Sequence, residues 1–567
     1  MTSLLTTDLR CRGGSLIICT LVWLAMVSAC ICDSNTDTKV VGSNPLETGF
    51  HVSPSQIPTQ WATFRPFLSS PQGNFCLGFQ EIMMMNSNMD HGYVLSIMYT
   101  IRVYNDSLGS ETGDTNSTTF EEEPFNMEMV WSANQDIPVS ANSTFSIDEE
   151  GYMALIDSDN YGSNKVNVWS PTTKSGANNT SSGGVILGQS LRLEENGNLV
   201  FSSLHNNDTM IAWQSFEHPT DTILPEQNFT ASMALSASLL ASATTVPLIN
   251  VTFNLKMESD GMALYVTGIG RNASSDETIY WKHMADQATG LIDPSQGPIY
   301  ARIARNGYLA MYQTEKSRVS YEPFNTYNST DVSRRRMKLD NDGNIRVYYW
   351  SFPSWKVDYQ GVNKLCDLPS PCGPYGICNG NTNNNMDPGI ACECPHPLVR
   401  KNESNAMQGC GMSRKDDQMQ CFVNDPESQL YVSLEGVQSL FQKDELINTS
   451  SGLSSKSRSA SECETECNSD CECVAYFYSN MSAIRCSFAY HSALAMQNST
   501  NDGDMAFIKI VKLPSLSSLS ASPITTAIPS SFMKPHDRSH IVKIIMPIFS
   551  CVFALVLVLC LASYCLH

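Results

Sequence analysis

The chain has 567 residues, of which 42% are hydrophobic and 16% are charged, so it can bury several cores and is globular, not disordered. Its 56 acidic and 35 basic side chains give a net charge of −21, whose field repels polyanions and excludes nucleic acid as a partner. We therefore interpret the three arginines at residues 334–336 as the solvated start of a strand.

The N-terminus has the pattern of a secretory signal. Arg10 and Arg12 precede an apolar run that is too short to span a bilayer comfortably, and polar sequence follows at once. We expect residues 1–32 to be the signal and residues 33–59 to form an N-terminal segment. Cleavage after Ala29 would leave two further cysteines in the mature chain. The protein is thus expected in the oxidising secretory pathway.

Asn-x-Ser/Thr sequons occur throughout the chain. Behind a secretory signal, this density predicts a glycoprotein whose sequon-bearing segments lie on the surface. The sequons are at Asn105, Asn116, Asn142, Asn178, Asn179, Asn207, Asn228, Asn250, Asn272, Asn328, Asn402, Asn448, Asn480 and Asn498.

One phrase recurs through the first two thirds of the chain: a polar or acidic residue, then Gly, then alternating apolar residues. The copies are EEGYMALID at 149, ENGNLVFSS at 195, SDGMALYVT at 259, RNGYLAMYQ at 305 and NDGNIRVYY at 341. Asp-Gly or Asn-Gly between alternating runs predicts a hairpin with a type I′ turn. Residues 60–355 lack long helix-period segments, which indicates an all-β region.

A second repeat accompanies the first. Trp131, Trp169 and Trp213 each follow an apolar neighbour and precede Ser or Gln. Three similar sheets that each supply one indole to a shared centre would produce this period. Each indole N–H would then need a partner, which a strand carbonyl can supply.

The motifs GNFCLGF, MVWSANQDIPVS, LRLEENGNLVF and AWQSFEHPTDTILP resemble the bulb-type (G-type) lectin domain of plant S-locus glycoproteins and S-domain receptor-like kinases. The resemblance implies a β-prism of three four-stranded sheets, here residues 60–230. It also implies a second, diverged lectin-like β domain, here residues 231–355. The expected fold class is therefore two all-β lectin prisms in tandem, followed by smaller modules.

Mannose-binding members of that family use the frame Gln-x-Asp-x-Asn-x-Val-x-Tyr. In the first unit the frame falls on Glu194, Asn196, Asn198, Val200 and Ser202, which retains only Asn198 and Val200. In the copy at residues 148–156 all five positions differ. The best copy retains three positions and has an arginine at the apolar position. Its residues are Asp340, Asp342, Asn344, Arg346 and Tyr348.

These frames leave two interpretations. Asp342, Asn344, Tyr348, Asn198 and Val200 are candidate carbohydrate-binding residues. Each hydroxyl left without a partner costs about 1–3 kcal/mol, which consumes most of the affinity for a monosaccharide. We therefore favour the interpretation that the retained Asn and Gly residues are turn formers.

Two cysteine-rich modules follow. Residues 362–411 resemble an EGF-like module, which is too small for its own core and depends on crosslinks. The resemblance implies the disulfides Cys366–Cys378, Cys372–Cys392 and Cys394–Cys410. The spacing does not fit zinc, and the acidic run of calcium-binding EGF modules is absent, so no metal or cofactor is expected.

Residues 412–512 resemble an α+β PAN/apple domain, whose usual role is association with protein partners or with itself. Cys463 and Cys467 lie one helical turn apart and can tie a short helix to a sheet. Packing alone is the alternative role, and the disulfide pairing stays open. The cysteines of this module are Cys421, Cys463, Cys467, Cys471, Cys473 and Cys486. Cys76 is left over from both modules, and we expect it to be a small buried apolar residue.

No catalytic signature is recognised. Kinase motifs are absent, and the adjacent carboxylates Glu194 and Glu195 are expected on opposite faces of a strand, which is unsuitable for a glycosidase. The sequence predicts a non-catalytic recognition glycoprotein on the extracellular side of the plasma membrane, acting as a co-receptor, decoy or wall-associated binder. The alternatives are a functional mannose lectin and a structural cell-wall glycoprotein. The expected partners are proteins, the membrane and glycans.

The C-terminal region resembles a stalk and an anchor. Residues 513–540 are rich in Ser, Thr and Pro, and residues 541–566 form a membrane segment with an uncharged core at 544–566. Two mechanisms fit, a transmembrane helix and a GPI signal with Ser530 and Ser531 near the cleavage site. Lys534, Arg538 and Lys543 all precede the segment, which is unusual for a helix oriented by cytoplasmic charge.

We favour the helix, because the family that the chain resembles has one at this place. Treatment of intact cells with a phosphatidylinositol-specific phospholipase C should then leave the protein on the membrane. Release of the protein into the medium would instead establish a lipid anchor.

Overall fold

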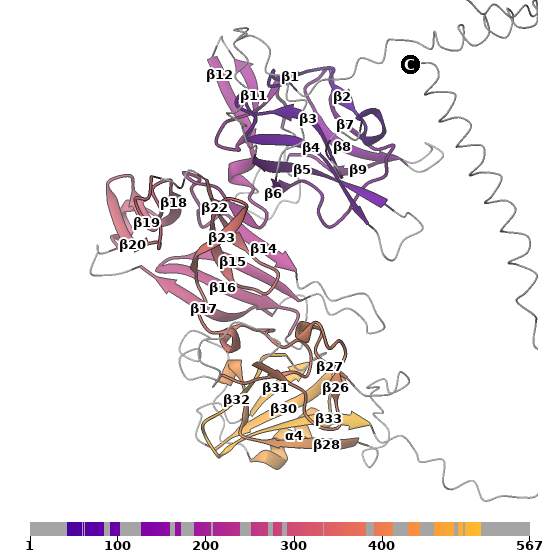
Figure 1. The fold of residues 1–567 in the computed structure, drawn as a ribbon, viewed down its shortest axis with the longest axis vertical. Helices are drawn as coiled ribbons and strands as arrows, with labels where there is room; N and C mark the ends of the chain where they lie inside the picture. Colours follow the sequence, from indigo (N-terminus) through magenta and orange to yellow (C-terminus); the bar gives the residue numbers. More distant parts are fainter. Residues whose placement is uncertain are drawn as a thin grey trace, which may run out of the picture. The chain divides into compact units, whose positions relative to one another are not determined.

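The computed structural model describes most of the chain between residues 42 and 511. The described residues are 42–58, 61, 63–83, 91–101, 126–158, 165–171, 186–205, 208–238, 251–269, 276–285, 292–330, 332, 334–380, 391–411, 429–442, 459–480, 486–490 and 494–511. The chain divides into two compact units, Met1–Lys512 and Leu513–His567, and the second lies outside the described residues. Strands dominate the first unit (Figure 1), which confirms the all-β expectation.

The first prism consists of three four-stranded antiparallel sheets. One contains β3 (Phe64–Ser69), β4 (Phe75–Met83), β5 (His91–Ile101) and β6 (Asn126–Ser132). Another contains β1 (Leu46–Glu47), β10 (Ser190–Leu193), β11 (Leu199–His205) and β12 (Asp208–Gln214). The third contains β2 (His51–Val52), β7 (Thr144–Ile147), β8 (Met153–Ser158) and β9 (Lys165–Trp169). Strands β1 and β2 come from the segment before residue 60 and cover an edge of two sheets.

The three tryptophans of the second repeat meet in this prism. The ring centroids of Trp131, Trp169 and Trp213 are 5.7–5.9 Å apart, and each pair is edge-to-face. This is a favourable geometry for aromatic quadrupoles. The indole N–H of Trp131 donates to the carbonyl of His218 at 2.8 Å. The expectation that each sheet supplies one indole to a shared centre is therefore confirmed, since Trp131, Trp169 and Trp213 belong to β6, β9 and β12.

The predicted type I′ turn is wrong. In four copies of the phrase only the glycine has a positive φ, as Gly197 does at 90° and Gly343 at 84°. The amide of that glycine bonds the carbonyl three residues earlier, as Gly197 does to Glu194 at 3.0 Å. This is a turn followed by a glycine bulge, which needs one left-handed residue instead of two.

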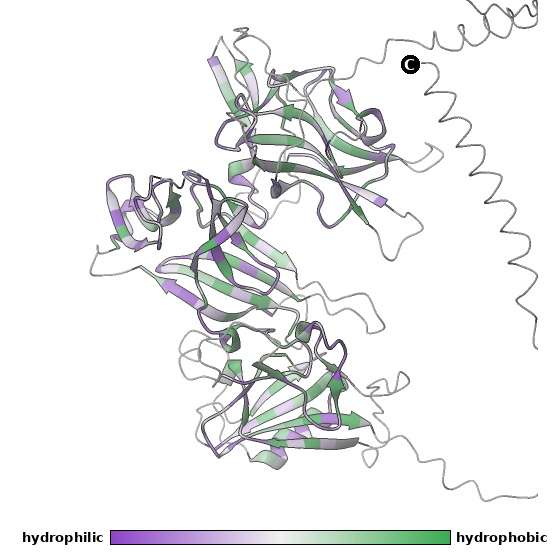
Figure 2. Ribbon diagram, viewed as in Figure 1, coloured by the Kyte–Doolittle hydropathy of each residue, from purple (hydrophilic) through white to green (hydrophobic). Residues whose placement is uncertain are grey.

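The second prism also has three antiparallel sheets. One four-stranded sheet contains β13 (Thr222–Ile223), β21 (Arg335–Leu339), β22 (Ile345–Ser351) and β23 (Ser354–Gln360). The other four-stranded sheet contains β14 (Ala234–Ser238), β15 (Thr252–Glu258), β16 (Gly261–Thr267) and β17 (Thr278–Met284). The three-stranded sheet is β18 (Tyr300–Ala304), β19 (Tyr308–Thr314) and β20 (Ser317–Pro323). Figure 2 shows apolar residues alternating with polar ones along these strands, as sheets with one buried face require.

The cysteine-rich region contains three small sheets. The first contains, in order, β25 (Cys392–Glu393), β24 (Ile377–Cys378), β32 (Met496–Asn498) and β29 (Val437–Ser439). The second pairs β26 (Val399–Arg400) with β27 (Cys410–Gly411). The third contains, in order, β28 (Gln429–Glu435), β33 (Asp504–Val511), β30 (Cys473–Ser479) and β31 (Cys486–Tyr490). The α-helix α4 (Ala460–Asn468) begins with a capping box between Ser459 and Glu462. The short 3₁₀ helices are Pro54–Gln56, Ser215–Glu217, Pro294–Gln296, Leu365–Asp367, Ala406–Gln408 and Leu440–Gln442.

The EGF-like and PAN modules share structure. Strand β24 of the former pairs in parallel with β32 of the latter, with Ile377 opposite Met496. Ile377 also packs in one apolar cluster with Phe477 of the PAN sheet. Cys366 packs in the core cluster of the second prism. The EGF-like module therefore borrows its apolar contacts from both neighbours.

The interpretation of residues 334–336 as a solvated strand start is wrong. Arg335 is 1% exposed, because its guanidinium pairs with the buried carboxylate of Asp358. It also donates to the hydroxyl of Thr326 at 2.7 Å and to the Thr326 carbonyl at 3.1 Å. Asp358 accepts from the Thr326 amide at 3.0 Å. The pair thus holds the loop around Thr326 against β21 and β23.

Trp131→Phe should lower the free energy of unfolding of the first prism by about 1–3 kcal/mol more than Trp169→Phe does, because the Trp131 indole donates to the half-buried carbonyl of His218, whereas the Trp169 indole has no such bond within the described part of the chain. The two substitutions remove the same volume from the same triad. Urea denaturation of the full chain, followed through amide hydrogen exchange of β11, would measure the free energy of unfolding of both variants. Equal losses would contradict this role of the His218 carbonyl.

Asp358→Asn should destabilise the second prism by about 3–5 kcal/mol, because it leaves the guanidinium of Arg335 buried without its counter-charge. Glu315→Gln is the matched control, since Glu315 is 69% exposed in its pair with Arg302 and such solvent-screened pairs contribute little to stability. Thermal unfolding of both variants tests the difference, and similar shifts for the two would refute the argument.

Candidate carbohydrate-binding site

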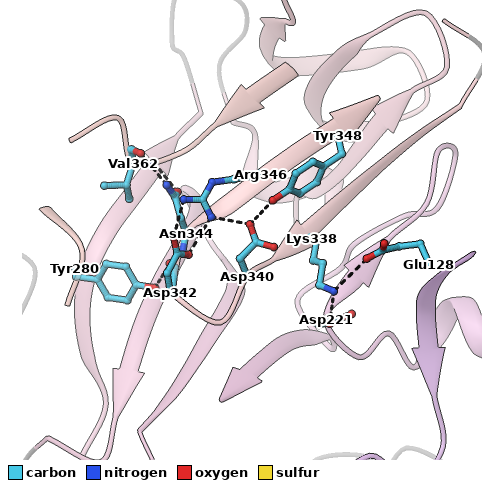
Figure 3. Close-up of polar contacts among 11 residues, drawn as sticks. Glu128, Asp221, Tyr280, Lys338, Asp340, Asp342, Asn344, Arg346, Tyr348 and Val362 are labelled. Atoms are coloured by element: carbon cyan, nitrogen blue, oxygen red, sulfur yellow. Dashed lines mark hydrogen bonds and ion pairs between the residues drawn. The ribbon is translucent and has the colours of Figure 1, made fainter. Parts of the chain in front are cut away.

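The best copy of the sugar frame lies on the hairpin of β21 and β22. Leu339 and Ile345 are paired at its end, and Lys338 is opposite Arg346. Alternation along β22 places Arg346 and Tyr348 on one side of the sheet. The turn brings Asp340 and Asp342 to the same side, so the structure does assemble the frame residues that the sequence predicted (Figure 3).

Arg346 occupies the centre of this frame. Its guanidinium donates to Asp342 at 2.6 and 3.0 Å and to Asp340 at 2.7 Å. The hydroxyl of Tyr348 donates to the same oxygen of Asp340 at 2.6 Å. Both carboxylates and the phenol are therefore engaged by the protein itself, and the arginine fills the space where the apolar contact to a sugar would lie.

The electrostatics of the frame match this pairing. Burial lowers the pKa of Arg346, but hydrogen bonds and charges from Asp342 and Asp340 outweigh it and leave the pKa raised. Burial, and then the charge of Asp340, raise the pKa of Tyr348 above its usual range. Arg346 thus stays charged and Tyr348 stays protonated at any physiological pH, and the network does not open by titration of either group.

Asn344, the third retained position, is buried at 0% exposure. Its amide nitrogen donates to the carbonyl of Val362 at 2.8 Å, and its amide oxygen accepts from the Val362 N–H at 2.9 Å. Next to it, the hydroxyl of Tyr280 donates to the carbonyl of Gly343 at 2.5 Å. The asparagine therefore ties the hairpin to the returning chain and presents no polar atom to a ligand.

The first prism repeats this arrangement. Asn198 is 5% exposed, and its amide donates to Gln214 at 2.8 Å and accepts from the N–H of Phe216 at 3.2 Å. Val200 is 1% exposed, so its methyl groups are in the core and not on a surface. Ser202 donates to the carbonyl of Ser190. Neither candidate residue of this prism is placed to contact a sugar.

The remaining copy serves only as a turn. At residues 148–156 the carboxylate of Asp148 accepts from the Tyr152 amide at 2.7 Å, which closes the loop. Met153 and Leu155 of the following strand are buried. Nothing on this hairpin resembles a set of converging sugar ligands.

Glu194 and Glu195 do not act together. Both lie in the turn after β10 instead of within a strand. Glu194 pairs with Arg192 at 3.1 Å, whereas Glu195 accepts from the backbone N–H of Gln72 at 2.9 Å and from the side chain of Asn74. The expectation that they point to opposite faces of a strand is therefore wrong, and in the turn each carboxylate has its own partners.

Sequence reasoning missed a polar junction beside the frame. Lys338 lies 3.5 Å from Asp221 and 3.7 Å from Glu128 of β6, as Figure 3 shows. Arg336 pairs with the same Glu128 at 3.0 Å and lies over the ring of Tyr348. These side chains join the two prisms beside the frame residues. In the sequence, only the spacing of Arg336 and Lys338, two residues apart on β21, indicated that they share a face.

The cysteines pair as follows. The disulfides of the EGF-like module are Cys366–Cys378, Cys372–Cys392 and Cys394–Cys410, the pairing that the resemblance implied. In the PAN module Cys463 pairs with Cys486 and Cys467 with Cys473, so two bonds tie α4 to the sheet. Cys471 is also disulfide-bonded, while Cys421 lies outside the described residues. Cys76 is buried beside Trp61 and Phe64. Disulfides fit passage through an oxidising compartment.

The predicted glycosylation sites can be compared with the exposure of their asparagines. The sequons at Asn142, Asn228, Asn328, Asn480 and Asn498 are exposed, and Asn402 is half-buried, as surface glycosylation requires.

Among the described residues no cluster of three or more His, Cys, Asp or Glu could hold a metal ion. In the same part of the chain no helix has the length and apolarity to cross a membrane. The predicted signal, stalk and membrane segment all lie outside the described residues.

Three known families match successive parts of the chain. Residues 128–244 match the D-mannose binding lectin family, residues 299–402 the S-locus glycoprotein domain, and residues 442–495 the PAN-like domain. All three are non-catalytic domain types, in agreement with the absence of catalytic motifs from the sequence.

Similar proteins are known in plants. A PAN domain-containing protein of Arabidopsis thaliana is 34% identical over 36% of this chain and 38% of its own length. A G-type lectin S-receptor-like serine/threonine-protein kinase of the same plant is 25% identical over 51% of this chain and 32% of its own. The chain thus spans about a third of the length of these relatives.

Among solved structures, the fetuin-binding two-domain lectin of Scilla campanulata is similar at 15% identity, with 39% of this chain and 89% of that one covered. The TM-score is 0.13, so no statement about the fold rests on it. The order of the three matched families, together with the relatives, shows that this chain has the domain set of a plant S-domain ectodomain.

Proposed function

We propose that the protein is a non-catalytic recognition glycoprotein of the cell surface, a receptor-like ectodomain that acts as a co-receptor, decoy or wall-associated binder. One observation carries the proposal. Arg346 pairs with both Asp340 and Asp342 from the position where a mannose lectin contacts the sugar ring. The lectin fold therefore serves here as a scaffold, and recognition resides in other surfaces.

The polar arrangement argues against the alternative of a mannose lectin. A sugar would have to displace a half-buried guanidinium that makes three hydrogen bonds, and would find Asn344 already bonded to Val362. Leaving two or three such groups without partners costs about 1–3 kcal/mol each. That cost is comparable to the ~4 kcal/mol that a millimolar ligand gains.

The PAN module supports a protein partner. Its helix α4 is tied to β30 and β31 by two disulfides, which restrict the motion of the helix against the sheet. Relatives named as S-receptor-like kinases combine an ectodomain with a kinase, and the proposal is that this chain supplies recognition to such partners. The plasma membrane is the proposed location, through the segment at residues 541–566.

Calorimetry with mannose tests the proposal. The full chain should show no binding tighter than about 1 mM, which corresponds to ~4 kcal/mol. The double variant Asp340→Gln with Arg346→Val completes the mannose frame and should gain at least about tenfold in affinity, or ~1.4 kcal/mol. Asp340→Gln alone is the control, because Arg346 still pairs with Asp342 and blocks the frame.

Micromolar binding by the unmodified chain would establish the mannose lectin instead. A glycan array and chemical crosslinking on intact plant cells would distinguish a structural cell-wall glycoprotein from the proposed recognition glycoprotein. A structural wall glycoprotein would crosslink to wall polymers only, whereas a co-receptor or decoy would crosslink to membrane receptors.

A further inference from the structure

The three-stranded sheet of the second prism has an aromatic outer side. Its inner side is in the core, with Ile303, Leu309 and Met311 buried. Register places the alternate residues of β18, β19 and β20 together on the other side. With one ring from the following loop, these tyrosines form what we call the tyrosine face: Tyr300, Tyr308, Tyr312, Tyr321 and Tyr327.

The rings of the tyrosine face are contiguous. Those of Tyr308, Tyr321 and Tyr327 form a cluster with centroids 5.0–6.1 Å apart. Tyr300 and Tyr312 stack at 5.7 Å, and the hydroxyls of Tyr308 and Tyr312 are 3.5 Å apart, which links the two groups. Tyr327 is 41% exposed. A surface of flat rings with polar tips suits a ligand that has both apolar C–H faces and hydroxyls, as a sugar does.

Two arginines add hydrogen-bond donors to this surface. Arg318 lies 4.3 Å from the ring centroid of Tyr321, and within the described residues no carboxylate is within ion-pair distance of it. Arg302 lies 5.6 Å from the ring of Tyr300 and is paired with Glu315. The donors of Arg318 are therefore available to the oxygen atoms of a sugar or of an acetamido group.

A glycosylation sequon begins at the edge of this face. Asn328 directly follows Tyr327, is exposed, and is the first residue of Asn-Ser-Thr. Its amide oxygen accepts from the side chain of Asn306 at 3.1 Å, and Asn306 lies in the turn two residues before Tyr308. A glycan linked to Asn328 would start beside the ring cluster. The buried pair of Arg335 and Asp358 holds the loop that carries the sequon.

We propose that the N-linked glycan of Asn328 lies on the tyrosine face, with its first sugars against the rings of Tyr327, Tyr308 and Tyr321. The occupant is then part of the chain itself, and the glycan closes this side of the second prism to outside partners. The second sequon near this sheet lies further from the ring cluster. The side chain of Asn228 accepts from Arg302 at 2.7 Å, and Arg302 belongs to β18, which β19 separates from β20 with its Tyr321.

The first test is enzymatic release of glycans from the native full chain made in plant cells. Glycopeptide mass spectrometry should find Asn328 occupied, and a peptide N-glycosidase should release its glycan about fivefold more slowly than that of Asn142, since a lost ring contact is worth ~1 kcal/mol. Asn142 is the internal control, because it is exposed in a turn and follows Ala141 instead of a tyrosine. Tyr327→Ser should raise the rate at Asn328 to that at Asn142.

An unmodified Asn328, occupancy of Asn228 alone, or equal release rates before and after Tyr327→Ser would each overturn the proposal. A second measurement separates the glycan from the side chains. Thr330→Ala removes the sequon and should speed amide exchange of β19 and β20 about fivefold, by the same ~1 kcal/mol. Thr330→Ser keeps the sequon and should leave exchange unchanged. Equal exchange in the two variants would show that no glycan covers the face.

Discussion

The need to bury one face of three sheets around a common axis governs the lectin part of this protein. A single sheet of four short strands cannot hide its apolar side from water, but three sheets can share one core. In the first prism the shared axis is occupied by Trp131, Trp169 and Trp213, one from each sheet. The repeated phrase in the sequence follows from this constraint, because each sheet requires a similar hairpin with its apolar residues on the same side.

The same constraint gives the asparagines of the two frames a structural role. Asn198 and Asn344 occupy corresponding positions, and the amide oxygen of each accepts a backbone N–H of the chain that returns past the hairpin. A buried amide whose polar atoms are all hydrogen-bonded is costly to replace. These two asparagines of the frames are therefore residues that the fold itself uses. In the second frame, Arg346 pairs with both carboxylates.

Beyond the prisms, covalent links and borrowed contacts replace independent cores. The EGF-like module contributes β24 to a sheet with β32 of the PAN module and places Cys366 against the second prism. Its three disulfides restrict the unfolded chain, which compensates for the small apolar area it can bury. The two modules are therefore joined to each other through paired strands and to the second prism through apolar contacts.

Sequence by itself determined the features that depend on local chemistry and period. It predicted the strands and hairpins, the three converging tryptophans, the burial of Cys76, and the helix tied to a sheet through Cys463 and Cys467. It failed where a side chain's environment comes from distant segments. Arg335 reads as a surface residue until β23 brings Asp358 to it, and Lys338 meets Glu128 only across two prisms. Likewise, whether Asp342, Asn344 and Tyr348 face a ligand or one another depends on Arg346 and Val362, because the partners of a polar group are chosen by the tertiary structure and not by its neighbours in the chain.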